Sequence, residues 1–206
     1  MIRWIFTFVL LPISSFLLTR GSNLFSSNFS SISVLLHRRG EFFLWCLLCG
    51  GFFYSQLSLY RPRQANDCLL LLIASALLPY APELHPVCAV LHTLLALAAA
   101  LLFLYHLFYL SLQLYFSSPK PAHHSQSASQ TAFWAQSPRC LHSPAARGRL
   151  CLLLLWTCSV FCLNAWILSG IINSAMEICL TFTSGIVFWL LFPSHRRTSN
   201  HTHIIL

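Results

Sequence analysis

The sequence predicts an all-α fold, a polytopic membrane helical bundle with six transmembrane helices. Hydrophobic residues make up 57% of the 206-residue chain and charged residues only 8%, which leaves too little polar surface to cover a soluble domain of this size. The run from His85 to Phe116 contains no aspartate, glutamate, lysine or arginine. Because about 20 apolar residues are enough to cross a bilayer, this run alone predicts a membrane helix.

Six apolar segments predict the six spans, at residues 4–19, 42–60, 68–82, 87–116, 150–168 and 174–192. No small-x-small cleavage site cleanly follows the first segment, so we expect an uncleaved span rather than a signal peptide. The third is short, because Asn66-Asp67 predicts its N-terminal cap and Pro79 and Pro82 close it. A four-residue break at 170–173 separates the last two.

Polar segments separate these spans. Serine and asparagine are frequent between the first two spans, which predicts an exposed loop. Residues 117–149 are rich in serine, histidine, glutamine and proline, and predict a flexible cytosolic loop. Residues 193–206 are expected to form a cytosolic tail.

The basic residues set the predicted orientation. With a cytosolic N-terminus, nine of the 12 face the cytosol, namely Arg3, Arg61, Arg63, Lys120, Arg139, Arg147, Arg149, Arg196 and Arg197. Three, Arg20, Arg38 and Arg39, face the lumen. This bias follows the positive-inside rule and predicts that both termini are cytosolic. It also explains the net charge of +8 without a nucleic-acid partner, and it leaves Asn28-Phe29-Ser30 as a lumenal glycosylation acceptor at Asn28.

Polar side chains recur on one face of two predicted spans and form a candidate intramembrane site. Its members are His92, His106, Tyr109 and Gln113 on the fourth span, and Asn173, Glu177 and Thr181 on the sixth, where Ser184 continues the same face. Two interpretations stay open: hydrogen bonding between packed helices, or a pocket for a ligand or lipid headgroup. The predicted orientation brings His92 and Glu177 to a similar depth near the lumen, so we expect this pair to meet.

The cysteines and the other polar residues predict no metal site, cofactor or catalytic site. Cys46 and Cys49 form a C-x-x-C motif, but it lies inside an apolar span without a second pair, and a zinc site needs about four ligands. Cys151, Cys158 and Cys162 recur near helical spacing and are interpreted as ordinary packing. A nucleophile with a matching base is not apparent, so we expect no enzymatic activity.

Several short motifs follow one another in a familiar order: Ile32-Ser33, Tyr60-Arg61, Asn66, His92 with Ala96, Tyr105 or Tyr109 with Gln113, and Ser174-Ala175 before Glu177. This order resembles the DRAM family of autophagy modulators, within a superfamily that includes Sfk-type and post-GPI-attachment membrane proteins. The chain departs from the family at Leu94, Leu95 and Ile178, where relatives carry two glycines and a tryptophan.

The resemblance implies a non-enzymatic multi-pass protein of lysosomal, endosomal, Golgi or plasma membranes, linked to autophagy and acting through membrane lipids or membrane-protein partners. Two other interpretations remain open. One is a small-molecule, ion or lipid transporter that uses the two polar faces, and the other is a factor in GPI-anchor or lipid handling. A lipid-modifying enzyme is disfavoured because the catalytic groups are not apparent.

Overall fold

The computed structural model describes residues 2–78, 80, 82–116 and 143–192, which form helices joined by short turns and loops and contain no strand. Three helices are long and apolar enough to cross a membrane: α6 (Pro86–Phe116), α7 (Pro144–Ser169) and α8 (Ser174–Leu191). Most of the apolar surface of α6 and α7 faces outward rather than into the protein. The all-α class and the presence of candidate membrane helices are therefore confirmed.

The chain begins with one nearly continuous helix that contains a π-helical insert. Its parts are α1 (Ile2–Ile5), η1 (Phe6–Leu10) and α2 (Leu11–Thr19). Thr7 in the insert is fully buried. It lies against Gly185 of α8, where an added Cβ would come within 2.9 Å of Thr7 Cγ2. The π-helical turn thus lies at a close approach between the first and last helices.

A short helix, α3 (Phe29–Leu35), occupies part of the segment predicted to be a polar loop. Asn28 and Ser31 form a reciprocal capping box: Ser31 N donates to Asn28 Oδ1 at 2.7 Å, and Asn28 N donates to Ser31 Oγ at 3.0 Å. Phe29 and Ile32 are buried against Leu18 of α2. The loop prediction was wrong here because the cap and this burial stabilise a helix too short to stand out in the sequence.

The next two helices, α4 (Arg39–Ser58) and α5 (Pro62–Leu77), form a hairpin. The start of α5 corrects the prediction: it begins at Pro62, a residue suited to the first helical position, and Asn66-Asp67 lie inside it. The helix also ends before residue 82, because Leu78 adopts extended backbone geometry (ψ 128°).

Helix α7 begins earlier than predicted, so the connection between α6 and α7 ends before residue 149. Ser143 caps α7 by accepting a hydrogen bond from Ala146 N at 3.1 Å, so residues 144–149 are helical rather than part of a loop. Residues 117–142, and the predicted tail at 193–206, lie outside the described residues. Gly170 (φ 69°) ends α7, and α8 begins four residues later.

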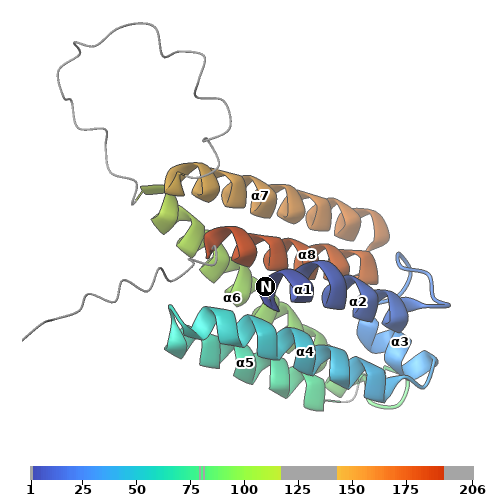
Figure 1. The fold of residues 1–206 in the computed structure, drawn as a ribbon. Coiled ribbons are helices and arrows are strands. Elements are labelled where there is room, and N and C mark those ends of the chain that lie inside the picture. Colours follow the sequence, from blue (N-terminus) through green and yellow to red (C-terminus); the bar gives the residue numbers. More distant parts are fainter. Residues whose placement is uncertain (1, 79, 81, 117–142, 193–206) are drawn as a thin grey trace, which may run out of the picture.

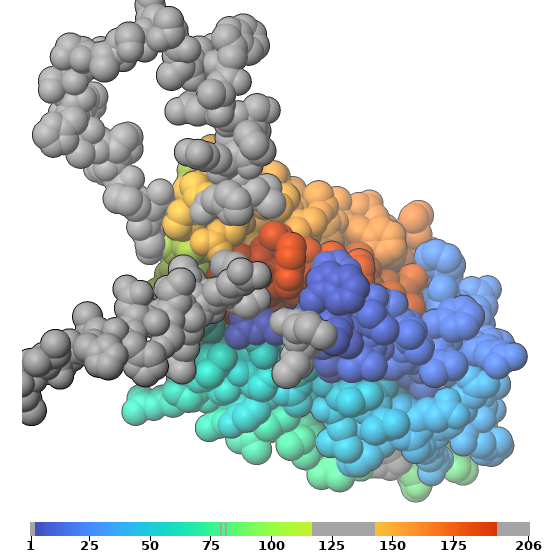
Figure 2. Space-filling model, viewed as in Figure 1, coloured from blue at the N-terminus to red at the C-terminus, as the bar shows by residue number. Residues whose placement is uncertain are grey.

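The helices pack as two hairpins joined by α6 (Figure 1). The α4–α5 hairpin lies on one side and the α7–α8 hairpin on the other, and α6 contacts both α5 and α7. The N-terminal helix lies between α4 and α8 on the face shown in Figure 2. One buried cluster includes Leu107, Leu155, Val187 and Phe188. Phe53 and Phe103, which pack against it, also line the cavity described next.

Candidate functional site

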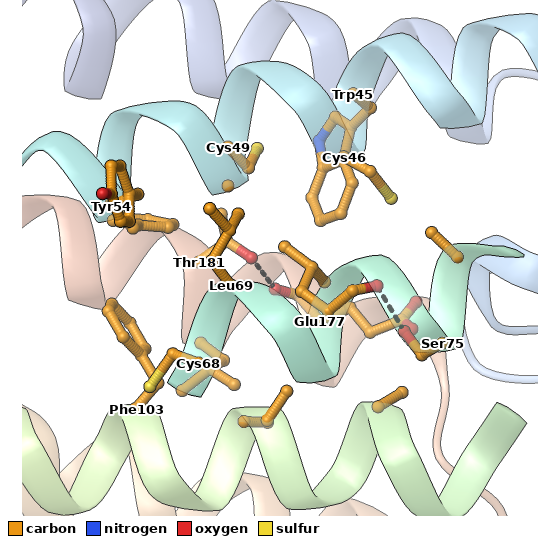
Figure 3. Close-up of a pocket in the computed structure, with 18 of the residues that line it drawn as sticks. Trp45, Cys46, Cys49, Tyr54, Cys68, Leu69, Ser75, Phe103, Glu177 and Thr181 are labelled. Carbon is orange, nitrogen blue, oxygen red and sulfur yellow. Dashed lines mark hydrogen bonds between the residues drawn. The ribbon is translucent and has the colours of Figure 1, made fainter. Parts of the chain in front are cut away.

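A cavity of about 210 Å³ lies between α4, α5, α6 and α8 (Figure 3). Its walls are mostly apolar. Space is available because Gly50, Ala96, Ala99 and Ala100 line it with little or no side chain. The cavity is also partly open to the outside. It is therefore an accessible space rather than a sealed packing defect.

His92 lines the cavity and is held at both ring nitrogens. Nδ1 lies 2.7 Å from the backbone oxygen of Ser75, near the end of α5. Because a carbonyl oxygen only accepts, Nδ1 carries a proton. Nε2 lies 2.8 Å from Ser30 Oγ of α3, so in the neutral ring it accepts from that hydroxyl. The imidazole thus joins α3, α5 and α6 and is fixed in orientation.

Glu177 also lines the cavity, from the first turn of α8. Its Oε2 accepts a hydrogen bond from the backbone N–H of Phe29 at 2.7 Å. This N–H is the first of α3 and has no acceptor within its own helix. The other carboxylate oxygen, Oε1, forms no hydrogen bond with any described residue. One oxygen therefore stabilises α3, and the other is available to a ligand.

Two hydroxyl groups extend the polar lining along α8. Thr181 Oγ1 donates to the backbone oxygen of Glu177 at 2.6 Å. Ser184 is fully buried, and its hydroxyl has no hydrogen-bond partner among the described residues. An unsatisfied buried hydroxyl is costly, so Ser184 offers a ligand a hydrogen bond that the protein itself does not use.

The remaining lining is apolar and aromatic. Figure 3 shows Tyr54 and Phe103 at the opposite end of the cavity from Glu177 and Ser75. Phe53 belongs to this aromatic end, with its ring centroid 5.0 Å from that of Phe103. The cavity consequently has a polar end near α3 and an apolar end deeper in the bundle.

The structure brings only part of the predicted polar site together. His92, Glu177 and Thr181 line one cavity. His92 and Glu177 do not bond each other directly: each bonds a neighbouring residue of α3, Ser30 or Phe29. His92 and Glu177 thus line the same cavity and both contact α3, but they do not contact each other through a hydrogen bond.

The other predicted residues have different environments. Asn173 is buried as the N-cap of α8, where Oδ1 accepts from Met176 N at 3.1 Å. His106 is buried, and neither ring nitrogen has a partner among the described residues. Arg61 lies over the Tyr109 ring at 3.8 Å, and the exposed Gln113 donates to the Tyr109 hydroxyl. The cavity lining includes none of the four predicted residues Asn173, His106, Tyr109 and Gln113. Asn28, the predicted glycosylation residue, caps α3.

The sequence did not indicate Ser30 or Ser75 as site residues. Ser184 lies on the polar face of α8 that helical spacing predicts together with Glu177 and Thr181, and it lines the cavity. Ser30 and Ser75 carried no such signal, because their place depends on how α3 and the end of α5 dock against α6. Cys46, Cys49 and Cys68 also line the cavity.

Comparison of the sequence with protein-family models, with curated proteins and with solved structures found no match in any of the three. The cavity and its side chains are therefore the basis for a functional assignment.

Proposed function

We propose that this protein is a non-enzymatic six-span membrane protein that binds a single-chain lipid with a hydrogen-bond-donating head. The observation that carries the proposal is the division of one cavity into a polar end, with Glu177 and His92, and an apolar end, with Phe53 and Phe103. An amphiphile satisfies both ends at once. The assignment agrees with the membrane-lipid partner expected from the sequence.

The lengths of the helices support six spans. In addition to the three apolar helices α6, α7 and α8, the N-terminal helix and α4 have 18 and 20 residues. At 1.5 Å per residue they measure about 27 and 30 Å, close to the thickness of a hydrocarbon core. The 16 residues of α5 measure about 24 Å, which requires local thinning of the bilayer around this helix. The bias of basic residues then puts both termini in the cytosol.

The size and chemistry of the cavity define the ligand class. At about 210 Å³ it is smaller than most drug-sized pockets, so it excludes a whole two-chain phospholipid and encloses part of one acyl chain, whose remainder can leave through the opening. Glu177 Oε1 is an acceptor without a described donor, which favours a hydroxyl or ammonium head over a carboxylate. Sphingoid bases and monoacylglycerols have this chemistry.

Photoaffinity labelling tests the proposal. The purified full-length protein in nanodiscs would be irradiated with diazirine-bearing sphingosine, monoacylglycerol or fatty acid, and the labelled peptides mapped by mass spectrometry. We expect labelling by the amine and hydroxyl probes on α4, α6 and α8. We expect much weaker labelling by the fatty acid, whose carboxylate meets Glu177.

Two substitutions on α6 provide the matched comparison. Ala96 lines the cavity, whereas Ala98, two residues away, is exposed on the outer surface. Ala96→Phe should fill the cavity and abolish labelling, and Ala98→Phe should leave it intact. Equal labelling of both variants, or equal labelling by the three probes, would show that the lipids contact only the outer surface and would contradict the proposal.

The resemblance to DRAM-type proteins gives the cellular part of the proposal, a role in autophagy at lysosomal or other endomembranes. Depletion is then expected to change autophagic flux, and the full-length protein should restore it. Rescue by Ala98→Phe but not by Ala96→Phe would connect that role to the cavity. Unchanged flux on depletion would remove the autophagy assignment and leave the lipid-binding test unaffected.

A further inference from the structure

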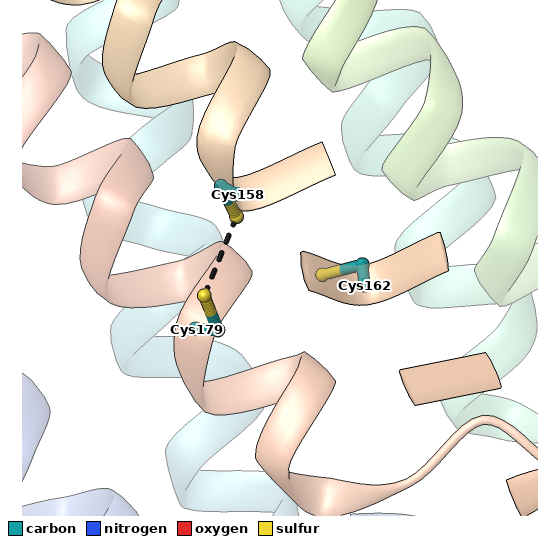
Figure 4. Close-up of side chains that lie close together, drawn as sticks. All are labelled: Cys158, Cys162 and Cys179. Carbon is teal, nitrogen blue, oxygen red and sulfur yellow. Dashed lines mark hydrogen bonds between the residues drawn. The ribbon is translucent and has the colours of Figure 1, made fainter. Parts of the chain in front are cut away.

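Three cysteines converge on the seam between α7 and α8, away from the cavity. Cys158 and Cys162 are one turn apart on α7, and Cys179 faces them from α8 (Figure 4). Their sulfur atoms all lie within 4.8 Å of one another, and the Sγ atoms of Cys158 and Cys179 are 3.6 Å apart. The three thiols thus point toward a common centre.

We propose that Cys158, Cys162 and Cys179 bind one Cu⁺ ion. Metal–thiolate bonds are about 2.3 Å long, so three sulfurs around one ion in a plane lie about 4.0 Å apart. The observed separations, 3.6 Å for one pair and at most 4.8 Å for the others, are compatible with this value. Small side-chain rotations are therefore enough to complete the site, without movement of either helix.

The donor set favours copper over zinc. Among the described residues, no fourth histidine, cysteine, aspartate or glutamate joins the three thiols. Structural zinc takes four ligands, whereas soft thiolate sets also select Cu⁺. Two oxygen groups lie beside the cluster: the backbone oxygen of Met176, 3.9 Å from Cys162 Sγ, and the Thr183 hydroxyl, next to Cys158 and Cys179. Oxygen is a hard donor, so neither suits a soft metal ion.

The position of the cluster gives an ion a route to it. Cys158 is buried, but Cys162 and Cys179 are partly exposed. Cys179 lies five residues after the start of α8, about 8 Å from that helix end. On binding, each coordinating thiol releases its proton to the solvent as its S–Cu bond forms. The copper and the sulfurs keep their oxidation states, so no oxidant is required.

Anaerobic titration of the reduced full-length protein in detergent micelles, with bathocuproine disulfonate as the competing Cu⁺ chelator, tests the site. We expect one Cu⁺ per chain and sulfur neighbours at about 2.3 Å in X-ray absorption spectra. Each of Cys158→Ser, Cys162→Ser and Cys179→Ser should weaken binding more than about 100-fold, since loss of even an outer contact to a metal ligand costs 10- to 100-fold. Cys151→Ser, on the same helix but outside the cluster, should bind normally.

Maleimide labelling of the wild-type protein keeps the test valid if a variant misfolds. Of the nine cysteines, Cu⁺ should protect Cys158, Cys162 and Cys179 from modification. Protection of other cysteines, absence of Cu⁺ uptake, preferential binding of Zn²⁺, or a Cys158–Cys179 disulfide that persists in the reduced preparation would each overturn the assignment. Because Ala96→Phe should leave Cu⁺ binding unchanged, the result is independent of the lipid-binding proposal.

Discussion

Glu177 Oε2 lies 2.7 Å from the backbone nitrogen of Phe29, a residue 148 positions earlier in the chain. This hydrogen bond joins the start of α8 to the start of α3. Ser174 strengthens the same junction, because its backbone N–H and its hydroxyl both donate to the backbone oxygen of Ser27, at 2.8 and 2.7 Å. The last helix therefore holds the first loop against the bundle and closes the polar end of the cavity.

Removing the acceptor at Glu177 should destabilise this junction. Glu177→Ala leaves the Phe29 N–H without its partner, and we expect a loss of about 1–3 kcal/mol in the free energy of unfolding, measured by SDS titration in mixed micelles. Glu177→Gln keeps an acceptor oxygen and should cost less than about 1 kcal/mol. Glu83→Ala is the control, because Glu83 is exposed between α5 and α6. Equal losses for the alanine and glutamine variants would show that the hydrogen bond contributes little.

The Ser30–His92 hydrogen bond should appear as an energetic coupling. A double-mutant cycle with Ser30→Ala and His92→Ala is expected to give an interaction energy of about 0.5–1.5 kcal/mol. The control cycle combines Ser30→Ala with His106→Ala, because His106 lies 14 residues, or about 21 Å, beyond His92 along α6. That second cycle should be additive. Interaction energies of equal size in the two cycles would show that the coupling does not come from the Ser30–His92 hydrogen bond.

Gly148 should tolerate no side chain. A Cβ at this position would lie 2.7 Å from the backbone nitrogen of Tyr115 and 2.9 Å from its Cα, so α6 and α7 would have to separate. We expect Gly148→Ala to cost about 1–3 kcal/mol, despite the better helix propensity of alanine. Gly51→Ala is the control in α4, where a Cβ meets no atom within 4 Å. It should be neutral or stabilise by up to about 1 kcal/mol, and a stable Gly148→Ala variant would contradict the close packing.

The proposed six-span topology predicts a glycan at Asn28 and cytosolic tags at both termini. Ser30→Thr preserves the acceptor sequence, whereas Ser30→Ala removes it. Digestion with an endoglycosidase should therefore change the gel mobility of the wild-type and threonine proteins but not of the alanine variant. Tag accessibility in selectively permeabilised cells supplies the second measurement. An N-terminal tag protected in the lumen would reject the six-span arrangement.

The long apolar helices were predictable because one physical signal dominates them. The expected fourth span, 87–116, differs from α6 (Pro86–Phe116) by one residue, since its apolar run is uninterrupted and Pro86 begins it. The start of α5 was not predicted, because Asn66-Asp67 was interpreted as the N-terminal cap, whereas the helix begins one turn earlier, at Pro62. Helix α3 depends on contacts with α2 and α8 that no local pattern reveals.

Part of the site was predictable from the order and direction of the spans. The alternation of spans brought His92 and Glu177 to one depth, and both line the cavity. Gln113 shares a helical face with His92 but is 21 residues away, about 32 Å along the helix, so one cavity cannot contain both. Periodicity specifies the face of a helix and leaves the depth open. The proximity of Cys179 to Cys158 and Cys162 was missed for the same reason. Residues at similar distances from the 170–173 connection become neighbours when α7 and α8 pack as a hairpin.

The burial of Ser30 sets an order of events during biosynthesis. Its hydroxyl belongs to the glycosylation acceptor sequence and is also the partner of His92, and Asn28 is already engaged as a helix cap. A glycosyltransferase needs both residues free, so the glycan that the proposed six-span topology predicts at Asn28 would have to be attached before α3 docks. His92 is synthesised 62 residues after Ser30, and Glu177 of α8 follows 148 residues after its partner Phe29. At about 5–20 residues per second the first of these intervals is roughly 3–12 s. Slower translation should therefore raise the glycosylated fraction, and faster translation should lower it.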